Sequence, residues 1–338
     1  MRKCAAVILA AGKGTRMKSE QAKVIFKIAE KELVRRVTET ALQIDCDPIG
    51  IVIGYQKEKV INAIPAHDKI VFIEQKEQHG TGHAVMVTAE CFENFDGDLF
   101  ILCGDIPLLS KNTLFDLQRI HQENRAACTV LTIRLSDPAA YGRVVRNKEG
   151  DVCNIVEFKD ATEEERKINE INTGIYCYDS KLLFEALKLL NNENKQHEYY
   201  LTDTLAILKK MGKKVIGLLT ENEAEVTGIN SQKELAELET DYYRKIKDLW
   251  LKNGVSIEQP ESVIIGEDVS LERDVEIETG TILKGKTQIG SGSKIGAYSY
   301  LMDAQLGKNV ILEGYNIVKN AQINDNSHLT FQEKKIND

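Results

Sequence analysis

Apolar residues recur at every sixth position near the end of this chain, and that period leaves few folds open to the segment. Repeats of six residues are typical of parallel β-helices. A small antiparallel sheet also places apolar groups at even spacings, but it does not select every sixth position so regularly. We therefore predict a short parallel β-helix with glycines at its corners. The series runs through Ile265, Leu271, Ile277, Leu283, Ile289, Ile295 and Leu301 and, after a slip of one residue, through Leu306, Leu312 and Val318; the corner glycines are Gly266, Gly290, Gly292 and Gly296.

The first 228 residues show a different pattern, in which short β-branched runs alternate with helical periodicity. This alternation is typical of an α/β domain with a mostly parallel sheet. Several of the runs end in glycine or a polar residue, as expected where ligands lie at the carboxyl ends of strands. The strands that we predict are Ala5–Leu9, Ile49–Ile53, Ile70–Ile73, Leu99–Cys103 and Cys128–Arg134.

A charged helix is predicted between these two parts. Ser231 and Glu234 have the spacing of a capping box, and the pattern continues through Tyr242 and Trp250 to Gly254. The predicted organisation is therefore a domain over 1–228, a linker helix over 229–254 and a β-helix over 255–338. The β-helix is expected to have about three coils and to end in a polar tail, Asn324–Asp338.

Composition narrows the class of protein. The net charge is −8, whereas a general nucleic-acid-binding protein usually has an excess of basic residues, so that class is not favoured. The seven cysteines are scattered, with no Cys-x-x-Cys pair, so neither a disulfide framework nor a zinc site is indicated. The apolar run Ala5–Ala11 is too short for a membrane span, and no cleavage-type segment follows it. We expect a cytoplasmic protein with no membrane or nucleic-acid partner.

A glycine-rich, basic loop follows the first predicted strand, and it favours a polyphosphate ligand. It reads Gly12-Lys13-Gly14-Thr15-Arg16-Met17, with Lys23 shortly after. Two glycines let the backbone approach phosphate closely, and the three cations supply positive charge. There is no Gly-Lys-Ser/Thr ending, and Met17 replaces the third dinucleotide glycine, so neither a kinase-type P-loop nor NAD binding is supported. A nucleoside triphosphate is the natural ligand.

Motifs along nearly the whole chain resemble the sugar-1-phosphate nucleotidylyltransferases, and among them the bacterial N-acetylglucosamine-1-phosphate uridylyltransferases. They are Leu9-Ala-Ala-Gly-Lys-Gly-Thr-Arg-Met17 with Lys23, Gln75, Gly80-Thr-Gly-His-Ala84, Gly104-Asp105-Ile-Pro107, Tyr141-Gly-Arg143, Ile155-Val-Glu-Phe-Lys-Asp-Ala-Thr162, Glu170-Ile-Asn-Thr-Gly174, Glu198-Tyr-Tyr-Leu-Thr-Asp203 and Gly228-Ile-Asn230. The resemblance implies a Rossmann-like nucleotidyltransferase domain with a mostly parallel sheet, followed by a short left-handed parallel β-helix.

The resemblance also implies a reaction: Mg²⁺-dependent transfer from UTP to N-acetylglucosamine 1-phosphate, giving pyrophosphate and UDP-N-acetylglucosamine, a cell-wall precursor. Two alternatives stay open. The same chemistry could use another nucleotide or another sugar 1-phosphate, such as glucose 1-phosphate. The chain could also be a non-catalytic subunit that binds a nucleotide sugar, although the charged motif residues are all present.

Each group of matched residues has an implied role. The cations that stabilise the transferring phosphoryl group are Arg16 and Lys23. The nucleotide-binding residues are Leu9, Ala11, Gly12, Gly14, Gln75, Gly80 and Thr81. The sugar-binding residues are Gly142, Glu157 and Asn172, with Thr173 as a neighbour. The Mg²⁺ ligands are Asp105 and Asn230, both oxygen donors. His83 has a structural role, because the attacking phosphate oxygen is already ionised and no proton must be removed.

The chain departs from the family pattern near Lys23, where Ala22 replaces the usual proline and Ala29-Glu-Lys-Glu32 replaces Ala-Gly-Lys-Pro, and two further departures bear on function. Cys103 stands where related proteins often have tyrosine, next to the implied metal and sugar residues, so the sugar preference is open there. In bifunctional members the β-helix continues into a coenzyme-A-dependent acetyltransferase. In this chain a segment similar to part of that acetyltransferase, His328-Leu-Thr-Phe331, lies in the predicted polar tail. We expect no acetyltransferase activity. Flat apolar faces of the β-helix favour self-association, and a homotrimer is the expected state.

Overall fold

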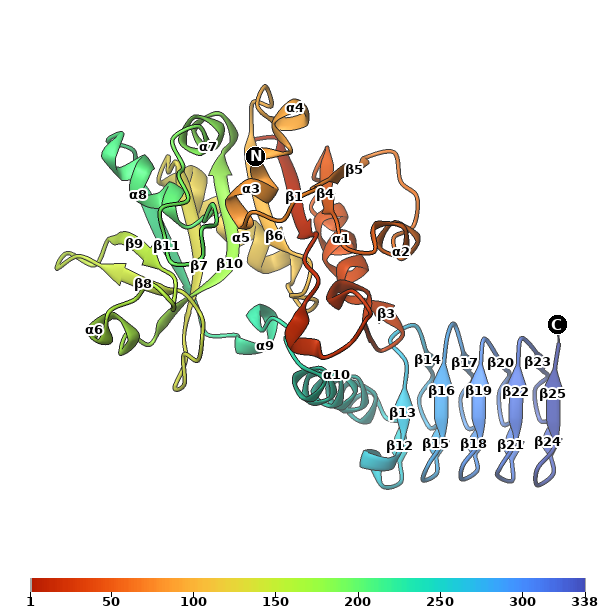
Figure 1. Ribbon diagram of the computed structural model, residues 1–338. Helices are drawn as coiled ribbons and strands as arrows, with labels where there is room; N and C mark the ends of the chain where they lie inside the picture. The colour runs from red at the N-terminus through yellow and green to blue at the C-terminus, as the bar shows by residue number, and fades with distance from the viewer. Residues whose placement is uncertain (1, 338) are drawn as a thin grey trace. The chain divides into compact units, whose positions relative to one another are not determined.

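The computed structural model describes residues 2–337, and these form two compact units (Figure 1). The first unit holds residues 2–27 and 31–232, and the second holds 28–30 and 233–337. None of the helices within residues 2–337 is both long and apolar enough to span a membrane.

The first unit is built on a nine-stranded sheet whose main strand order is β11-β7-β10-β6-β1-β4-β5. β10 runs antiparallel to β6 and β7, and the other neighbours on this path are parallel, so the mostly parallel sheet that we predicted is confirmed. The hairpin of β8 and β9 joins the sheet through β10. The strands are β1 Cys4–Ala10, β4 Ile49–Ile53, β5 Ile70–Glu74, β6 Asp98–Cys103, β7 Cys128–Arg134, β8 Arg143–Arg146, β9 Val152–Val156, β10 Glu170–Asp179 and β11 Val215–Thr220.

Helices cover both faces of this sheet, which gives three layers (Figure 1). Alternate residues of β1 enter two separate cores: Ala6, Ile8 and Ala10 pack with helices α1 and α5, whereas Ala5 and Val7 pack with α3, α7 and α8. The helices are α1 Leu33–Gln43, α2 Lys57–Asn62, α3 Thr81–Met86, α4 Ala89–Phe92, α5 Lys111–Glu123, α6 Glu163–Arg166, α7 Ser180–Leu187, α8 Asp203–Lys210 and α9 Glu223–Val226. Two short strands, β2 Lys27–Ile28 and β3 Lys31–Glu32, pair with each other.

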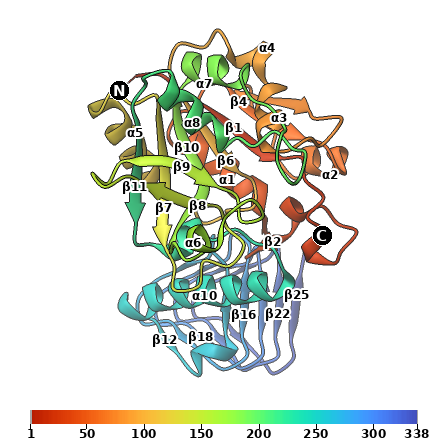
Figure 2. The ribbon, with the colours of Figure 1, turned by 60° about the vertical axis from the view of Figure 1, so that its left-hand side comes forward.

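The second unit begins with α10, Gln232–Lys252, which covers Tyr242 and Trp250 as the pattern predicted. Gly254 follows its end with φ +89°, a backbone conformation that glycine adopts without strain. Ile246 and Trp250 pack against the β-helix core, and Lys247 donates to the Pro260 carbonyl in the first coil. Figure 2 shows α10 lying along the coils.

The β-helix consists of three parallel sheets in which each short strand except the last, β25, buries one side chain. Sheet C contains β12 Ser256–Ile257, β15 Glu276–Ile277, β18 Lys294–Ile295, β21 Ile311–Leu312 and β24 His328–Leu329; sheet D contains β13 Ile264–Ile265, β16 Ile282–Lys284, β19 Tyr300–Met302, β22 Ile317–Lys319 and β25 Lys334–Ile336; sheet E contains β14 Ser270–Leu271, β17 Gln288–Ile289, β20 Gln305–Leu306 and β23 Gln322–Ile323. All the apolar positions of the six-residue series, Ile265 to Val318, lie in the buried core of this unit. The predicted left-handed parallel β-helix is therefore confirmed.

The polar tail predicted over 324–338 is wrong for residues 328–336, which add β24 and β25 to the coil. The register explains the error: Leu301 pairs with Val318 on the next coil and Leu306 with Ile323, so the spacing of five residues from Leu301 to Leu306 recurs from Val318 to Ile323. The prediction includes the first slip in the period but not the second, which moves Ile323 and Leu329 out of the six-residue phase. Sheets C and D each hold five strands, so the helix is longer than the predicted three coils. Asp338 lies outside the described residues.

Candidate active site

The loop after β1 brings its cations to the edge of the sheet through the conformation of Gly14. This residue has φ +70°, and a Cβ atom built on it would lie 2.5 Å from the Cβ of Lys23. The Gly14 carbonyl accepts from the Met17 N–H at 3.0 Å, which closes a 3-10 turn over Thr15–Met17. A second such turn, Lys23–Ile25, follows. Glycine is needed here because any side chain would push the two turns apart.

Four predicted site residues, far apart in the sequence, meet in one cluster of charge. The Lys23 ammonium contacts the Asp105 carboxylate and lies 3.1 Å from the Asn230 amide oxygen. Arg16 Nη2 donates to the same amide oxygen at 2.7 Å. Asp105 follows β6, and its backbone carbonyl accepts from the Ile229 N–H at 3.0 Å, which places Asn230 beside it.

The donor set in this cluster fits a divalent cation. The Asp105 carboxylate and the Asn230 amide oxygen both contact one positive charge, the Lys23 ammonium. Carboxylate and amide oxygens are ligands that Mg²⁺ accepts, and Mg²⁺ is commonly held by one or two protein groups together with substrate phosphates and water. Within residues 2–337, no group of three or more His, Cys, Asp or Glu side chains is placed to hold a metal ion. Phosphates and water would therefore supply most of the coordination.

A cavity of about 230 Å³ lies beside the glycine loop. Its walls include six of the seven residues predicted to bind the nucleotide, namely Leu9, Ala11, Gly12, Gln75, Gly80 and Thr81. Gly14 does not line it and instead supports Lys23. The remaining lining residues are Ala84 and Glu198, which belong to two of the motifs but had no predicted role, and Gln78, to which the sequence did not point.

A close approach of two backbone segments forms one side of this cavity. Gly80 has φ +101°, and a Cβ atom there would lie 2.7 Å from the Tyr199 carbonyl oxygen. The Gly82 N–H donates to that oxygen at 2.7 Å, and the Leu201 N–H donates to Thr81 Oγ1 at 3.1 Å. The segment around Tyr199 therefore packs on the Gly80 turn where α3 begins.

Gln75 is the buried polar residue of the cavity, with 3% of its surface exposed. Its side-chain amide donates to the Gly80 carbonyl at 3.3 Å and lies 3.0 Å from His83 Nδ1. Burial, and then the neighbouring His79, lowers the pKa of His83, which favours a neutral ring that accepts at Nδ1. The structural role predicted for His83 thus has a concrete form, which is to orient the Gln75 amide.

The three predicted sugar-binding residues form a second cluster. The Asn172 N–H donates to the Gly142 carbonyl at 2.9 Å, and a Cβ atom on Gly142 would lie 3.5 Å from Glu157 Oε2. Glu157 Oε1 accepts from Thr202 Oγ1 at 3.2 Å. Asn172 Oδ1 accepts from the Gly174 N–H at 3.0 Å. Carboxylate, amide and backbone groups of this kind match the donors and acceptors of sugar hydroxyls.

Acidic groups surround Glu157 and affect its protonation. Burial raises the pKa of Glu157 above its usual range, and the hydrogen bond from Thr202 offsets only part of that rise. Burial also raises the pKa of nearby Asp203. Thr173, expected as a neighbour of the sugar, is buried and donates its hydroxyl to the Leu131 carbonyl at 2.7 Å. Thr173 therefore fixes β10 against β7 and does not face a ligand.

Cys103 ends β6 two residues before Asp105 and packs against Gly174 on β10. Its Sγ lies 3.3 Å from the Gly174 carbonyl, and a Cβ atom on Gly174 would lie 2.7 Å from that sulfur. Burial, and then the Asp105 charge, raises the pKa of Cys103 to about 12, so the thiol stays neutral. Cys103 is therefore a packing residue.

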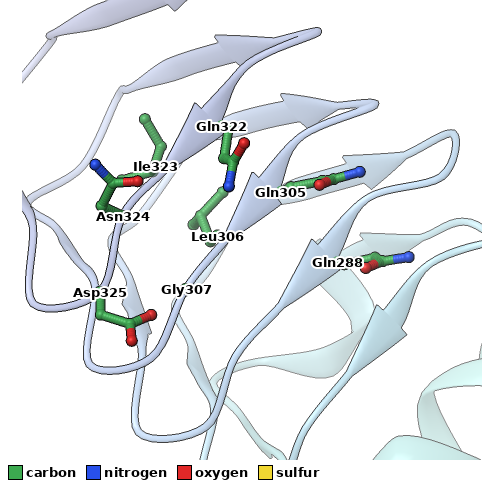
Figure 3. Close-up of a pocket in the computed structure, with 8 residues that line it drawn as sticks. All are labelled: Gln288, Gln305, Leu306, Gly307, Gln322, Ile323, Asn324 and Asp325. Atoms are coloured by element: carbon green, nitrogen blue, oxygen red, sulfur yellow. The ribbon is translucent and has the colours of Figure 1, made fainter.

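A separate hollow of about 500 Å³ lies on the outer surface of sheet E in the second unit (Figure 3). Gln288, Gln305 and Gln322 come from successive strands of that sheet and line it together with Asn324 and Asp325. The Asp325 carboxylate is already engaged, because it accepts from the Lys308 N–H at 2.8 Å. None of the residues predicted for the site lies in this hollow.

Comparisons with known proteins agree with this arrangement. The family model described as nucleotidyl transferase matches residues 5–249. The bifunctional protein GlmU of Carboxydothermus hydrogenoformans is 43% identical over 319 residues, which cover 94% of this chain and 70% of that protein. GlmU of Syntrophotalea carbinolica is 44% identical over 320 residues, covering 94% and 68%. A crystal structure of UDP-glucose pyrophosphorylase with UDP-glucose shares the fold, with a TM-score of 0.58 and 20% identity over 72% of this chain and 100% of that one.

Proposed function

This chain belongs to the nucleotidyl transferase family and to the family of the bifunctional GlmU proteins, and on that premise we propose that it transfers the uridylyl group of UTP to N-acetylglucosamine 1-phosphate. The observation that carries the proposal is the cluster of Arg16, Lys23, Asp105 and Asn230 beside the cavity that the glycine loop lines. The two are linked through the backbone, because Leu9 lines the cavity and its carbonyl accepts from the Gly104 N–H next to Asp105.

The reaction exchanges one phosphorus–oxygen bond for another. An oxygen of the sugar phosphate bonds to the α-phosphorus of UTP, the bond from that phosphorus to the bridging oxygen breaks, and pyrophosphate leaves with the electron pair. The attacking oxygen is already ionised near neutral pH, so the step needs no general base. The work left to the protein is to align two anions and stabilise the charge between them.

The cations of the glycine loop are suited to that work. Arg16 and Lys23 converge on the Asn230 amide oxygen from separate turns, so both are held near one point. Preorganised positive charge lowers the barrier because it needs little rearrangement as charge develops. Asp105 and Asn230 would hold Mg²⁺, which supplies divalent charge to the phosphates when bound.

We assign the base and the sugar to the two ends of the site. Gln75, oriented by His83 and the Gly80 carbonyl, would read the edge of the uracil. Glu157 and Asn172 would accept from and donate to the sugar hydroxyls. The Gly142 carbonyl is already bonded to Asn172, which leaves the Gly142 N–H as its backbone group for the ligand.

We also propose the molecular context. The catalytic domain extends over 1–228, α10 links it to the β-helix, and three chains associate through the flat faces of their β-helices. The described cysteines are all free thiols, which suits the reducing cytoplasm.

The test is pyrophosphate release with Mg²⁺ over a grid of four nucleoside triphosphates and several sugar 1-phosphates. Rapid release with UTP and N-acetylglucosamine 1-phosphate, lost in Asp105→Ala, supports the proposal. Preference for another pair keeps the chemistry and rejects the substrates. No release from folded protein, with retained binding of a UDP-sugar, would indicate a binding subunit.

A further inference from the structure

We propose that Arg143 is a positioning residue for the sugar end of this site: its buried side chain holds the loop that carries Gly142 against the ring of Phe158, which follows Glu157. The inference rests on the proposed function, since it concerns the sugar pocket of that reaction. It assigns a role to a residue of the Tyr141-Gly142-Arg143 motif that has none in the proposed reaction.

The Arg143 guanidinium binds backbone carbonyl groups. Only 2% of the residue is exposed, although it carries a charge. Nη2 donates to the Ala139 carbonyl at 2.9 Å, and Nη1 donates to the carbonyls of Pro138, at 3.2 Å, and Tyr141. Nε donates to the Arg166 carbonyl at the end of α6, at 3.3 Å. Three of these four carbonyls belong to the loop that leads into Gly142.

This pattern differs from that of an ordinary buried arginine, which is usually paired with a carboxylate. Here three backbone carbonyls of one short loop accept most of the hydrogen bonds of the guanidinium. All three must therefore point toward the Arg143 side chain at the same time. The loop conformation is strained: Ala139 has φ +40°, a region that residues with a side chain rarely adopt. Such a conformation persists only where its surroundings impose it. Two side chains hold it here: Arg143 donates to the Ala139 carbonyl, and Asp137 Oδ1 accepts from the Ala139 N–H at 3.0 Å.

The same side chain also contacts the ring of Phe158, on the segment that carries Glu157. The guanidinium carbon of Arg143 lies 5.3 Å from the centre of the Phe158 ring, and that of Arg166 lies 4.8 Å from it. Phe158 directly follows Glu157, and Gly142 lies beside the Glu157 carboxylate. Arg143 therefore sets the distance between the backbone group and the carboxylate assigned to the sugar.

Lysine cannot replace this arrangement, because it has one ammonium group in place of a planar fork with five donors. We expect Arg143→Lys to raise the KM for N-acetylglucosamine 1-phosphate about tenfold or more, with the KM for UTP changed less than about twofold and kcat at saturation reduced only slightly. The matched control is Arg166→Lys, which alters the other cation on Phe158 and leaves the carbonyl contacts intact. It should leave both KM values near those of the wild type.

A second measurement separates positioning from folding. Arg143→Ala, if folded by circular dichroism, should regain sugar affinity when methylguanidinium is added and should not respond to methylammonium. A parallel rise of both KM values, or no change in either, would overturn the inference. If the Arg143 variants do not fold, Phe158→Leu provides the test. A folded Phe158→Leu with a normal KM for the sugar would overturn the inference, because Arg143 would then act on stability alone. The KM ratio is measured with whichever sugar 1-phosphate the wild type accepts, so a failure of the proposed substrate is distinguishable from a failure of this inference.

Discussion

Lys23 and Asp105 form an ion pair at the carboxyl edge of the sheet, between a residue assigned to phosphate and a residue assigned to Mg²⁺. Their side chains are 16% and 19% exposed, so the pair is largely shielded from solvent. A carboxylate that is paired with an ammonium offers less charge to a divalent cation. On the proposed assignment, the lysine and the metal would therefore compete for Asp105 until phosphate offers the lysine another partner.

Lys23→Met should therefore tighten Mg²⁺ binding by the protein alone, by about threefold to tenfold for a pair of this exposure. Turnover should fall at the same time, because the phosphates lose a cation. Calorimetry with Mg²⁺ measures the first effect and pyrophosphate release the second. Lys23→Arg is the control, and equal Mg²⁺ affinity in Lys23→Met and the wild type would contradict the competition.

Arg16→Ala should lower kcat about 100-fold with little change in stability, because Arg16 is exposed and its assigned role is to stabilise developing charge. Lys13→Ala is a matched control from the same loop. Lys13 is also exposed, but its ammonium lies 5.3 Å from the centre of the Tyr55 ring. Steady-state kinetics of the two variants, with thermal melts, would decide the assignment. Equal losses would show that only the net charge of the loop matters.

Two glycines of the nucleotide cavity should respond differently to alanine. At Gly80 a Cβ atom would meet the Tyr199 carbonyl at 2.7 Å and φ is +101°, whereas at Gly12 no atom lies within 4 Å. Gly80→Ala should destabilise the first unit, by about 1–3 kcal/mol from backbone strain alone. Gly12→Ala should melt like the wild type and raise the KM for UTP about tenfold if phosphate approaches that backbone closely. A normal KM for UTP in Gly12→Ala would place the triphosphate elsewhere.

The raised pKa of Glu157 predicts a pH dependence with a definite sign. The folded-state pKa lies above the unfolded value, so the contribution to stability is full below the unfolded pKa and is lost as the pH rises through the folded pKa. Glu157→Gln should therefore raise Tm at pH 8, by about 2–4 °C for each kcal/mol of penalty removed, and should match the wild type near pH 4. Activity at pH 8 should fall, because the carboxylate assigned to the sugar is lost. Exposed Glu163→Gln is the control, and a Tm gain that persists at pH 4 would rule out this cause.

Neighbouring residues on β21 test the packing of the β-helix. Leu312 is 2% exposed and points into the core, whereas Ile311 is 41% exposed and points outward. Leu312→Ala should cost about 2–5 kcal/mol of unfolding free energy. Ile311→Ala should change it by less than about 0.5 kcal/mol. Denaturant titrations of the two variants give the comparison, and similar losses would mean that both faces of the strand are covered in solution.

The strands that the sequence predicted are those with continuous apolar runs, such as Ile49–Ile53, which is buried throughout. The missed strand β10 shows why others were not found. It carries Asn172, Thr173 and Gly174, and its register with β7 shifts between Asn172 and Tyr176. Polar residues and an irregular register remove the periodicity on which such predictions depend.

The residues of the candidate site, like the strands, were only partly predictable from the sequence. The chemistry of the glycine loop pointed to Arg16 and Lys23 from the residues alone, whereas Asp105 and Asn230 came from the family pattern and otherwise resembled turn residues. The contact of His83 with Gln75 and the carbonyl contacts of Arg143 had no local signal. They depend on how a loop folds back on its neighbours, which spacing along the chain does not encode.

The spacing of paired residues also bears on how fast each unit can form. In the sheet of the first unit, Cys4 pairs with Asp98, nearly a hundred residues away, whereas in the β-helix Lys294 pairs with Ile311 on the next coil. Closing a long loop costs more entropy than closing a short one, and folding slows as contacts become less local. The coils can propagate one after another from their neighbours. The rate-limiting event on the way to an active enzyme is therefore expected to be the closure of β6 against β1, the step that brings Asp105 to the glycine loop.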